Sequence, residues 1–106
     1  MSYRYMRIIV MFDLPTVTMT DKREYTLFRK FLLKNGFFML QQSIYCKLAQ
    51  NAVAADSIVE KVKKNKPPAG SVMLLKVTEK QFSKMEYIVG EASGEILDTD
   101  ERLVIL

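Results

Sequence analysis

Apolar and β-branched residues gather in short runs that predict strands. The first run, just after the start of the chain, is apolar and β-branched enough to form a buried strand. In the third run, Ile44, Cys46 and Leu48 alternate with more polar residues, so we expect these three to form its buried side. The four strands are predicted at residues 5–12, 37–40, 43–48 and 71–78.

Between the first two strands, apolar residues at helical spacing predict a helix. Asp21 and Glu24 form a D-x-x-E start that is close to a capping box, and Asn35-Gly36 is a strong C-terminal stop. One face of this helix should therefore pack on a sheet. The apolar residues at helical spacing are Tyr25, Phe28 and Leu32, with Phe31 beside them.

A second helix is predicted from about residue 51 to residue 65, where Pro67-Pro68 breaks the pattern. Beyond the fourth strand, Thr78 and Gln81 form a capping-box pair, which predicts a short helical turn over 79–84. The buried side of the second helix should consist of Ala55, Ile58, Val59 and Val62.

The order of elements predicts an α+β, ferredoxin-like βαββαβ fold in a single domain that covers residues 1–106. Two further strands are predicted at 85–89 and 102–106, within a C-terminal extension that covers 85–106. An apolar strand at 102–106 needs an edge to pair with, which favours a homodimer with this strand added across the interface.

Polar residues near the third strand are candidates for an interface or for contacts with phosphate. The segment 41–45 carries amides, a hydroxyl and a phenol, which can hydrogen-bond phosphate and sugar oxygens or satisfy one another between subunits. We favour the interface. The expected interface residues are Ser43, Tyr45, Leu103, Val104 and Ile105.

Composition excludes several classes of protein. No apolar run reaches the roughly 18 residues that span a membrane, and the N-terminal residues do not resemble a signal peptide, so we expect a cytoplasmic protein without a membrane partner. The sequence has no histidine and one cysteine, Cys46, which is expected in the core. These counts exclude histidine-based catalysis, histidine-ligated zinc and an internal disulfide.

Charge is distributed unevenly along the chain. Residues 1–84 hold 15 of the 16 Lys and Arg residues and 6 of the 12 Asp and Glu residues, a formal charge of +9. Residues 85–106 hold one arginine and six acidic residues, a formal charge of −5. A basic body favours a polyanionic partner such as nucleic acid, although a solvated basic surface has the same composition.

The predicted helices carry the candidates for phosphate binding. Arg23, Lys30 and Lys34 are spaced so that they share a stripe opposite the apolar side of the first helix. Such a stripe either binds phosphate or is solvated, and the sequence leaves both open. The remaining nucleic-acid-binding candidates are Arg7, Lys63 and Lys64.

Asp13 closes the first predicted strand, directly before Leu14-Pro15. Because proline cannot continue a central strand, the carboxylate lies where the sheet stops and a loop begins, a frequent place for a ligand or metal. An aspartate here is also a common turn-former. One carboxylate is a poor Mg²⁺ site, but two Asp13 side chains near a two-fold axis can share one ion, so Asp13 is the candidate metal-binding and catalytic residue.

Several motifs together resemble one family, the small dimeric CRISPR-associated adaptation proteins that act with the Cas integrase. The resemblance rests on residues 6–15, on the helix with Tyr25-x-x-Phe28, and on Gly36-Phe37 followed by 42–45. Residues 74–82 and 85–90 further resemble the type II-A branch, so the likeness covers nearly the whole chain.

The resemblance implies a ferredoxin-like homodimer that bridges integrase dimers and lies along captured double-stranded DNA during spacer acquisition. It also implies, for some members, a Mg²⁺-dependent endonuclease whose aspartate corresponds to Asp13. Several members carry a tyrosine or a second acid beside this aspartate, whereas Phe12 and Leu14 stand here. We therefore expect a structural DNA-binding adaptor, with a nuclease acting on RNA or DNA as the alternative.

A third hypothesis comes from another class, a small-molecule-sensing regulatory domain with the same ferredoxin-like fold. The lysine-rich body and the absence of a glycine-rich ligand loop count against it.

Overall fold

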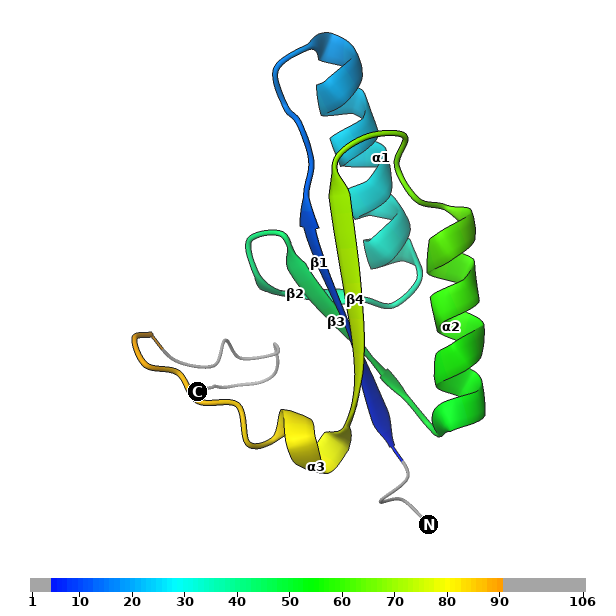
Figure 1. Ribbon diagram of the computed structural model, residues 1–106, viewed down its shortest axis with the longest axis vertical. Helices are drawn as coiled ribbons and strands as arrows, with labels where there is room; N and C mark the ends of the chain where they lie inside the picture. Colours follow the sequence, from blue (N-terminus) through cyan, green and yellow to red (C-terminus); the bar gives the residue numbers. More distant parts are fainter. Residues whose placement is uncertain (1–4, 91–106) are drawn as a thin grey trace.

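A computed structural model describes residues 5–90 of the chain (Figure 1). The elements are β1 (Met6–Asp13), α1 (Met19–Lys34), β2 (Phe38–Gln41), β3 (Ile44–Ala49), α2 (Ala52–Lys64), β4 (Ser71–Thr78) and α3 (Glu79–Phe82). The four predicted strands and two long helices are therefore confirmed, with ends that differ by a residue or two for most of them.

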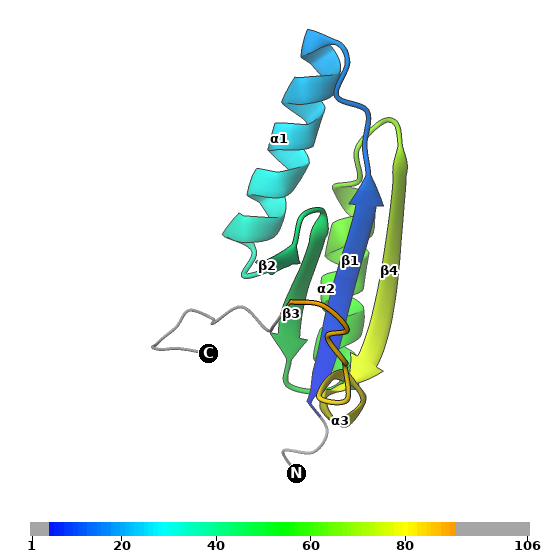
Figure 2. The same ribbon diagram turned by 90° about the vertical axis from the view of Figure 1, so that its left-hand side faces the viewer.

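The strands form one antiparallel sheet in the order β2-β3-β1-β4. Both views show α1 and α2 on one face of this sheet, while α3 and the segment up to Gly90 lie on the other (Figures 1 and 2). This arrangement confirms the predicted ferredoxin-like fold. We call the face turned away from α1 and α2 the open face.

The core lies between the sheet and the two long helices. Alternation along β1 turns Ile8, Val10 and Phe12 toward the helices, where they meet buried residues of α1 and α2. The Phe12 ring contacts the Phe28 ring edge to face, with 5.3 Å between the ring centroids, and stacks on the Tyr45 ring at 5.7 Å. Aromatic packing therefore fixes the end of β1 that leads to Asp13.

The start of α1 corrects one detail of the sequence analysis. Thr18 is the N-cap: its hydroxyl accepts a hydrogen bond from the Asp21 backbone N–H, and the Asp21 carboxylate accepts one from the Thr18 N–H. Asp21 is thus the N3 residue of the capping box rather than the cap itself. The predicted stop is confirmed, because Asn35 is the C-cap and Gly36 follows with a φ of +89°.

The second helix and the short helical turn match their predictions closely. Asn51 caps α2, and its side-chain oxygen accepts a hydrogen bond from the Ala54 N–H at 2.8 Å. In α3, the Thr78 hydroxyl accepts from the Gln81 N–H at 3.0 Å, and the Gln81 side chain accepts from the Thr78 N–H at 2.9 Å. Both caps satisfy N–H groups that have no partner inside a helix.

The burial of β3 differs from the prediction. Tyr45 faces the helices and is 1% exposed, whereas Leu48 lies on the open face and is exposed. Cys46 is buried as expected, but on the open face rather than among the core residues under the helices. The alternation was correct; the error was the face assigned to the core, because both faces of β3 carry buried residues.

The predicted strand at 85–89 is not formed within the described chain, which has no regular structure there. Ile88 and Val89 are 87% and 90% exposed. An apolar run becomes a strand only where an edge is available to pair with it, and within residues 5–90 this segment pairs with none. The predicted strand at 102–106 lies outside the described residues.

Candidate metal and nucleic-acid sites

The open face of the sheet carries Asp13 at one end and apolar residues along its length. Alternation along β1 places Ile9, Met11 and Asp13 on this face. On the neighbouring strand β4, Met73 and Leu75 pair with Met11 and Ile9 and are 60% and 51% exposed. The face is therefore an apolar surface that the described part of the chain covers only in part.

Asp13 is the last residue of β1, and its side chain is exposed. It pairs in register with Ser71, the first residue of β4. The preceding residue, Phe12, donates its N–H to the Ser43 carbonyl at 3.0 Å, which places the turn between β2 and β3 at the same end of the sheet. Of the predicted site residues, Asp13 and Ser43 thus lie at the same end of the sheet.

Gly70 holds the loop before β4 tightly against this end of β1. Its φ is +90°, and a Cβ at this position would lie 2.7 Å from the Asp13 carbonyl oxygen and 2.8 Å from Leu14 Cδ2. Only glycine satisfies both the backbone angle and the close approach. Sequence reasoning did not single out Gly70 as part of this site; the signal was the turn Pro67-Pro68-Ala69-Gly70 before β4.

A magnesium ion does not fit the donors that one chain offers at this end. Among residues 5–90 there is no group of three or more histidine, cysteine, aspartate or glutamate side chains that could hold a metal. Asp13 alone supplies one carboxylate, and Mg²⁺ requires near-octahedral coordination by several oxygen atoms. A metal centre at Asp13 therefore needs a second subunit, a nucleic-acid phosphate, or both.

Among the predicted DNA-binding residues, Arg7 has the most contacts with the rest of its own chain. Its guanidinium contacts both carboxylate oxygens of Glu79, with Nε–Oε1 and Nη2–Oε2 distances of 2.6 and 3.2 Å. It also lies 4.5 Å from the centroid of the Phe82 ring, and its side chain is 16% exposed. Because Arg7 is neutralised by Glu79 and packed against α3, these contacts argue against a phosphate contact at Arg7.

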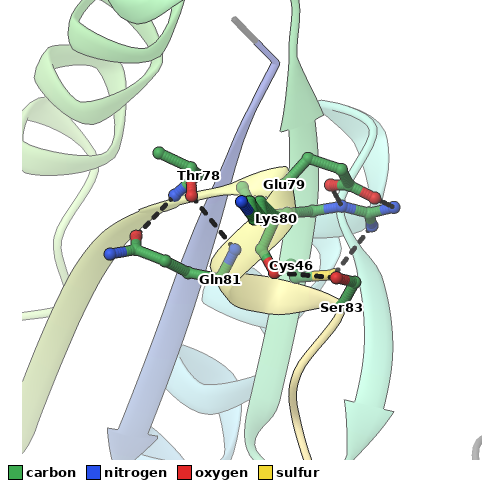
Figure 3. Close-up of polar contacts among 7 residues, drawn as sticks. Cys46, Thr78, Glu79, Lys80, Gln81 and Ser83 are labelled. Carbon is green, nitrogen blue, oxygen red and sulfur yellow. Dashed lines mark hydrogen bonds and ion pairs between the residues drawn. The ribbon is translucent and has the colours of Figure 1, made fainter. Parts of the chain in front are cut away.

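The electrostatics of Arg7 agree with a structural role. Burial lowers the pKa of Arg7, but the hydrogen bond and the negative charge of Glu79 outweigh burial and raise this pKa above its ordinary value. The Arg7 Nη1 also donates to Cys46 Sγ at 3.6 Å. Glu79 and Cys46, each of which contacts Arg7, lie beside the Thr78–Gln81 capping box (Figure 3). Through its contacts with Glu79 and Phe82, Arg7 therefore holds α3 against the open face of the sheet.

The other predicted nucleic-acid residues lie in the helical layer. They are exposed, and they do not meet Asp13, which faces the opposite side of the sheet. Lys63 also approaches the Glu60 carboxylate at 3.4 Å. On α1 these residues are Arg23, Lys30 and Lys34, and on α2 they are Lys63 and Lys64.

Tyr45 was predicted to be an interface residue, but its side chain is buried within the subunit. Its ring belongs to the core, and its hydroxyl accepts a hydrogen bond from Arg29 Nε at 3.0 Å. A side chain buried under α1 has no surface to offer a second subunit, so this prediction is corrected. Leu103, Val104 and Ile105 lie outside the described residues, and their interface role stays a prediction.

Comparison with known proteins decides the family. The sequence model of the family described as "CRISPR associated protein Cas2" matches residues 6–85. The chain belongs to the Cas2 family. A relative from Treponema denticola, named "CRISPR-associated endoribonuclease Cas2", is 55% identical over 95% of this chain and 100% of its own length. A relative of the same name from Streptococcus mutans is 48% identical over 95% of this chain and 93% of its own.

A solved structure supports the fold. A chain described as "Crystal structure of cas2" superposes with a TM-score of 0.58 and 19% identity, covering 94% of this chain and 99% of that one. In the described part of the present chain, no helix is both long and apolar enough to span a membrane. Membership of the Cas2 family argues against the hypothesis of a small-molecule-sensing regulatory domain.

Proposed function

We propose that this Cas2 protein is a homodimeric, structural DNA-binding adaptor in CRISPR spacer acquisition, which would place it with DNA in the cytoplasm. One observation carries the proposal: the fold separates a helical layer that exposes cations from an open face that is apolar. The apolar face suits a second protein subunit, and the cationic layer suits a duplex. In the adaptor role, the dimer would bridge two integrase dimers and support captured DNA.

The open face supports the homodimer. Met73 and Leu75 leave a large apolar area exposed on β4, which is also an edge strand of the sheet. Exposed apolar patches rimmed by polar residues mark protein interaction sites, and an unpaired edge can accept a strand from another chain. The exposed segment Tyr87-Ile88-Val89 is a suitable strand to add, since it is apolar and lies on the same side of the sheet.

The helical layer supports DNA binding that is independent of sequence. Arg23, Lys30 and Lys34 are exposed along α1, while Lys63 and Lys64 are exposed at the end of α2. Cations of this kind bind phosphates and release counterions, and they do not read bases.

A salt titration of duplex binding tests the adaptor. We expect Arg23→Glu, Lys30→Glu and Lys34→Glu together to weaken binding and to flatten its dependence on salt. Each lost phosphate contact lowers the slope of log K against log salt by about 0.9. The control reverses three exposed lysines outside α1 and α2, Lys76, Lys80 and Lys84. Equal losses in the two triple variants would show that only net charge matters and that the α1 stripe is not a binding surface.

A metal-dependent endoribonuclease is the second candidate, favoured by the printed names of the relatives and by the exposed carboxylate of Asp13 at the end of β1. When bound, Mg²⁺ would activate water and stabilise the leaving oxygen. Asp13 from two subunits would hold the ion at the end of the open face. Because one described chain provides a single carboxylate there, we rank this function below the adaptor.

Asp13→Asn separates the two functions, because it keeps size and hydrogen bonding but removes the charge that a hard cation needs. We expect the variant to fold, to dimerise and to support spacer integration with its integrase, while any Mg²⁺-dependent RNA cleavage falls sharply. Glu60→Gln, at an exposed acid on α2, is the matched control. Loss of spacer acquisition in cells, with dimer and complex intact, would contradict the adaptor and assign Asp13 a catalytic role.

A further inference from the structure

A small cavity of about 90 Å³ lies between the end of α1, the strand β3 and the second half of α2. Figure 1 shows the two helices on the same face of the sheet, so the cavity belongs to the helical layer and not to the open face. Two lysines line it, Lys47 of β3 and Lys61 of α2, and no carboxylate does. The other lining residues are Phe31, Asn35, Phe37, Ile58 and Val62.

Lys47 is a lysine on the side of the sheet that faces the helices. The residues at alternate positions of β3, Tyr45 and Ala49, are buried in the core, whereas Lys47 is half-buried. Its Nζ donates to the Asn35 carbonyl at 2.6 Å, which places the ammonium at the C-terminal end of α1. An ammonium has three N–H donors, and within residues 5–90 this carbonyl is the acceptor found for Lys47.

The positive charge at the cavity is not neutralised within residues 5–90. The ion pairs found there involve neither Lys47 nor Lys61, and the Lys61 ammonium makes no hydrogen bond there. The carbonyl groups of Phe31 and Leu33, which would repel an anion at the end of α1, already accept hydrogen bonds. An anion would therefore meet two cations without competition from a carboxylate.

The size of the cavity limits the anion that it can hold. A volume of about 90 Å³ lies well below the roughly 300 Å³ at which pockets for drug-sized ligands begin, so a nucleoside does not fit. At about 30 Å³ for each water molecule, it has room for a few waters or for one phosphate group. Apolar walls formed by Phe31, Ile58 and Val62 strengthen the attraction between such an anion and the lysines, because they exclude water.

The cavity also lies between the two groups of predicted DNA-binding cations. Lys34, at the end of the α1 stripe, is the residue before Asn35. Lys64 lies three positions after Lys61 and therefore follows it by about one turn of α2. A nucleic-acid strand that passes from the α1 stripe to the end of α2 would cross the cavity.

We propose that the cavity between Lys47 and Lys61 binds one phosphate group of a nucleic-acid backbone, with both ammonium groups donating to the same phosphate. This proposal rests on the proposed DNA-binding function and names a contact that joins the α1 stripe to α2. Lys47, which the sequence alone did not single out, would then both cap α1 and contact the phosphate.

The salt dependence of duplex binding tests whether the two lysines share one phosphate. Lys47→Met with Lys61→Ala should flatten the slope of log K against log salt by about 0.9, the contribution of one phosphate. Lys80→Met with Lys84→Ala removes the same charge outside the helical layer and should leave the slope unchanged. No change in the cavity variant, or a change of about 1.8 that indicates two separate phosphates, would overturn the proposal.

Lys61→Ala keeps the test valid if the loss of Lys47 disturbs the fold. Lys47→Met removes the hydrogen bond to Asn35, whereas Lys61→Ala removes no side-chain hydrogen bond or ion pair found within residues 5–90. We expect Lys61→Ala to retain the circular dichroism spectrum of the wild type and to bind duplex roughly two- to fivefold more weakly. Equal affinities of Lys61→Ala and the wild type would refute the shared phosphate site.

Inorganic phosphate provides a test that does not depend on DNA. We expect a titration of the ¹⁵N-labelled protein at constant ionic strength to give saturable shifts of the Gly36 amide resonance. Acetate should give none, and Lys61→Ala should abolish the response to phosphate. Shifts that do not saturate and that spread over exposed lysines throughout the chain would show a general ionic effect and would overturn the site.

The two titrations together separate failure of the site from failure of the proposed function. If the wild type binds duplex and the cavity variant leaves the salt slope unchanged, the site fails and DNA binding stands. If the wild type does not bind duplex while inorganic phosphate saturates at Gly36, the DNA-binding function fails. The second result would also overturn the nucleic-acid backbone as the source of the phosphate and leave a free phosphate compound as the ligand.

Discussion

The contact between Gly70 and the Asp13 backbone can be assigned a stability cost by comparing three glycines that share nearly the same backbone φ. Within residues 5–90, Gly36, Gly70 and Gly90 have φ values of +89°, +90° and +89°. Their surroundings differ: a Cβ on Gly90 meets nothing within 4 Å, one on Gly36 meets the flexible end of Lys47 at 2.5 Å, and one on Gly70 meets the Asp13 carbonyl oxygen at 2.7 Å. Substitution by alanine should therefore destabilise in the order Gly90, Gly36, Gly70.

The expected magnitudes follow from these contacts. Alanine with a left-handed backbone costs about 1–2 kcal/mol, and the stiffer unfolded chain offsets about 0.4–1 kcal/mol of this. Gly90→Ala should thus cost at most about 1.6 kcal/mol. Gly36→Ala also displaces the Lys47 ammonium from the Asn35 carbonyl, which it contacts at 2.6 Å, and should cost about 2 kcal/mol. Gly70→Ala adds overpacking against backbone, worth about 1–3 kcal/mol, for a total of about 3 kcal/mol.

Urea denaturation followed by circular dichroism measures all three variants, and the slope of unfolding free energy against urea should stay constant across the series. A loss of about 3 kcal/mol is a large part of the 5–15 kcal/mol by which domains are usually stable. If Gly70→Ala unfolds at the same urea concentration as Gly90→Ala, the loop does not press on the end of β1, and the reasoning that Gly70 positions Asp13 fails.

Three further substitutions test individual contacts by the same denaturation assay. Tyr45→Phe removes the hydroxyl that Arg29 contacts at 3.0 Å and should cost about 1 kcal/mol; no loss would show that Arg29 prefers solvent. Glu79→Gln leaves the largely buried Arg7 without a counter-charge and should cost about 1 kcal/mol, a modest figure because Glu79 itself is partly exposed. Thr18→Ala removes the cap of α1 and should cost about 1 kcal/mol; a neutral result would mean that the helix begins elsewhere.

Most of the fold could be predicted because the signals that begin and end helices depend on residues that are close together in the sequence. The capping box of Thr78 with Gln81 and the stop at Asn35-Gly36 involve residues within a few positions of one another, and both are found as predicted. The start of α1 was misplaced because two capping patterns overlap there. Both share Asp21, and spacing alone does not say which role this residue takes.

The errors at the candidate sites concern contacts between residues far apart in the sequence. Arg7 and Glu79 are 72 positions apart, and no local pattern indicates that a glutamate will neutralise this arginine. The alternation along β3 identified two faces correctly, but which face the helices cover depends on how α1 packs on Tyr45. Gly70 was visible as a turn residue, whereas its contact with the Asp13 backbone requires the three-dimensional fold.

The number of carboxylates available to a metal at Asp13 depends on whether two copies of the protein assemble. Strand alternation puts its carboxylate on the same face as Ile9 and Met11, the face that α1 and α2 leave open. A second copy that covers this face through a two-fold axis would present the same surface in return, because such an interface is self-complementary. One described chain supplies one carboxylate, which is too few for Mg²⁺, while two copies would supply two at the same end of their sheets. A metal centre with more than one protein carboxylate therefore requires the dimer, whereas the dimer does not require a metal centre. This asymmetry is why Asp13→Asn is informative: a variant that still assembles and still supports integration has lost only the chemistry that depends on assembly.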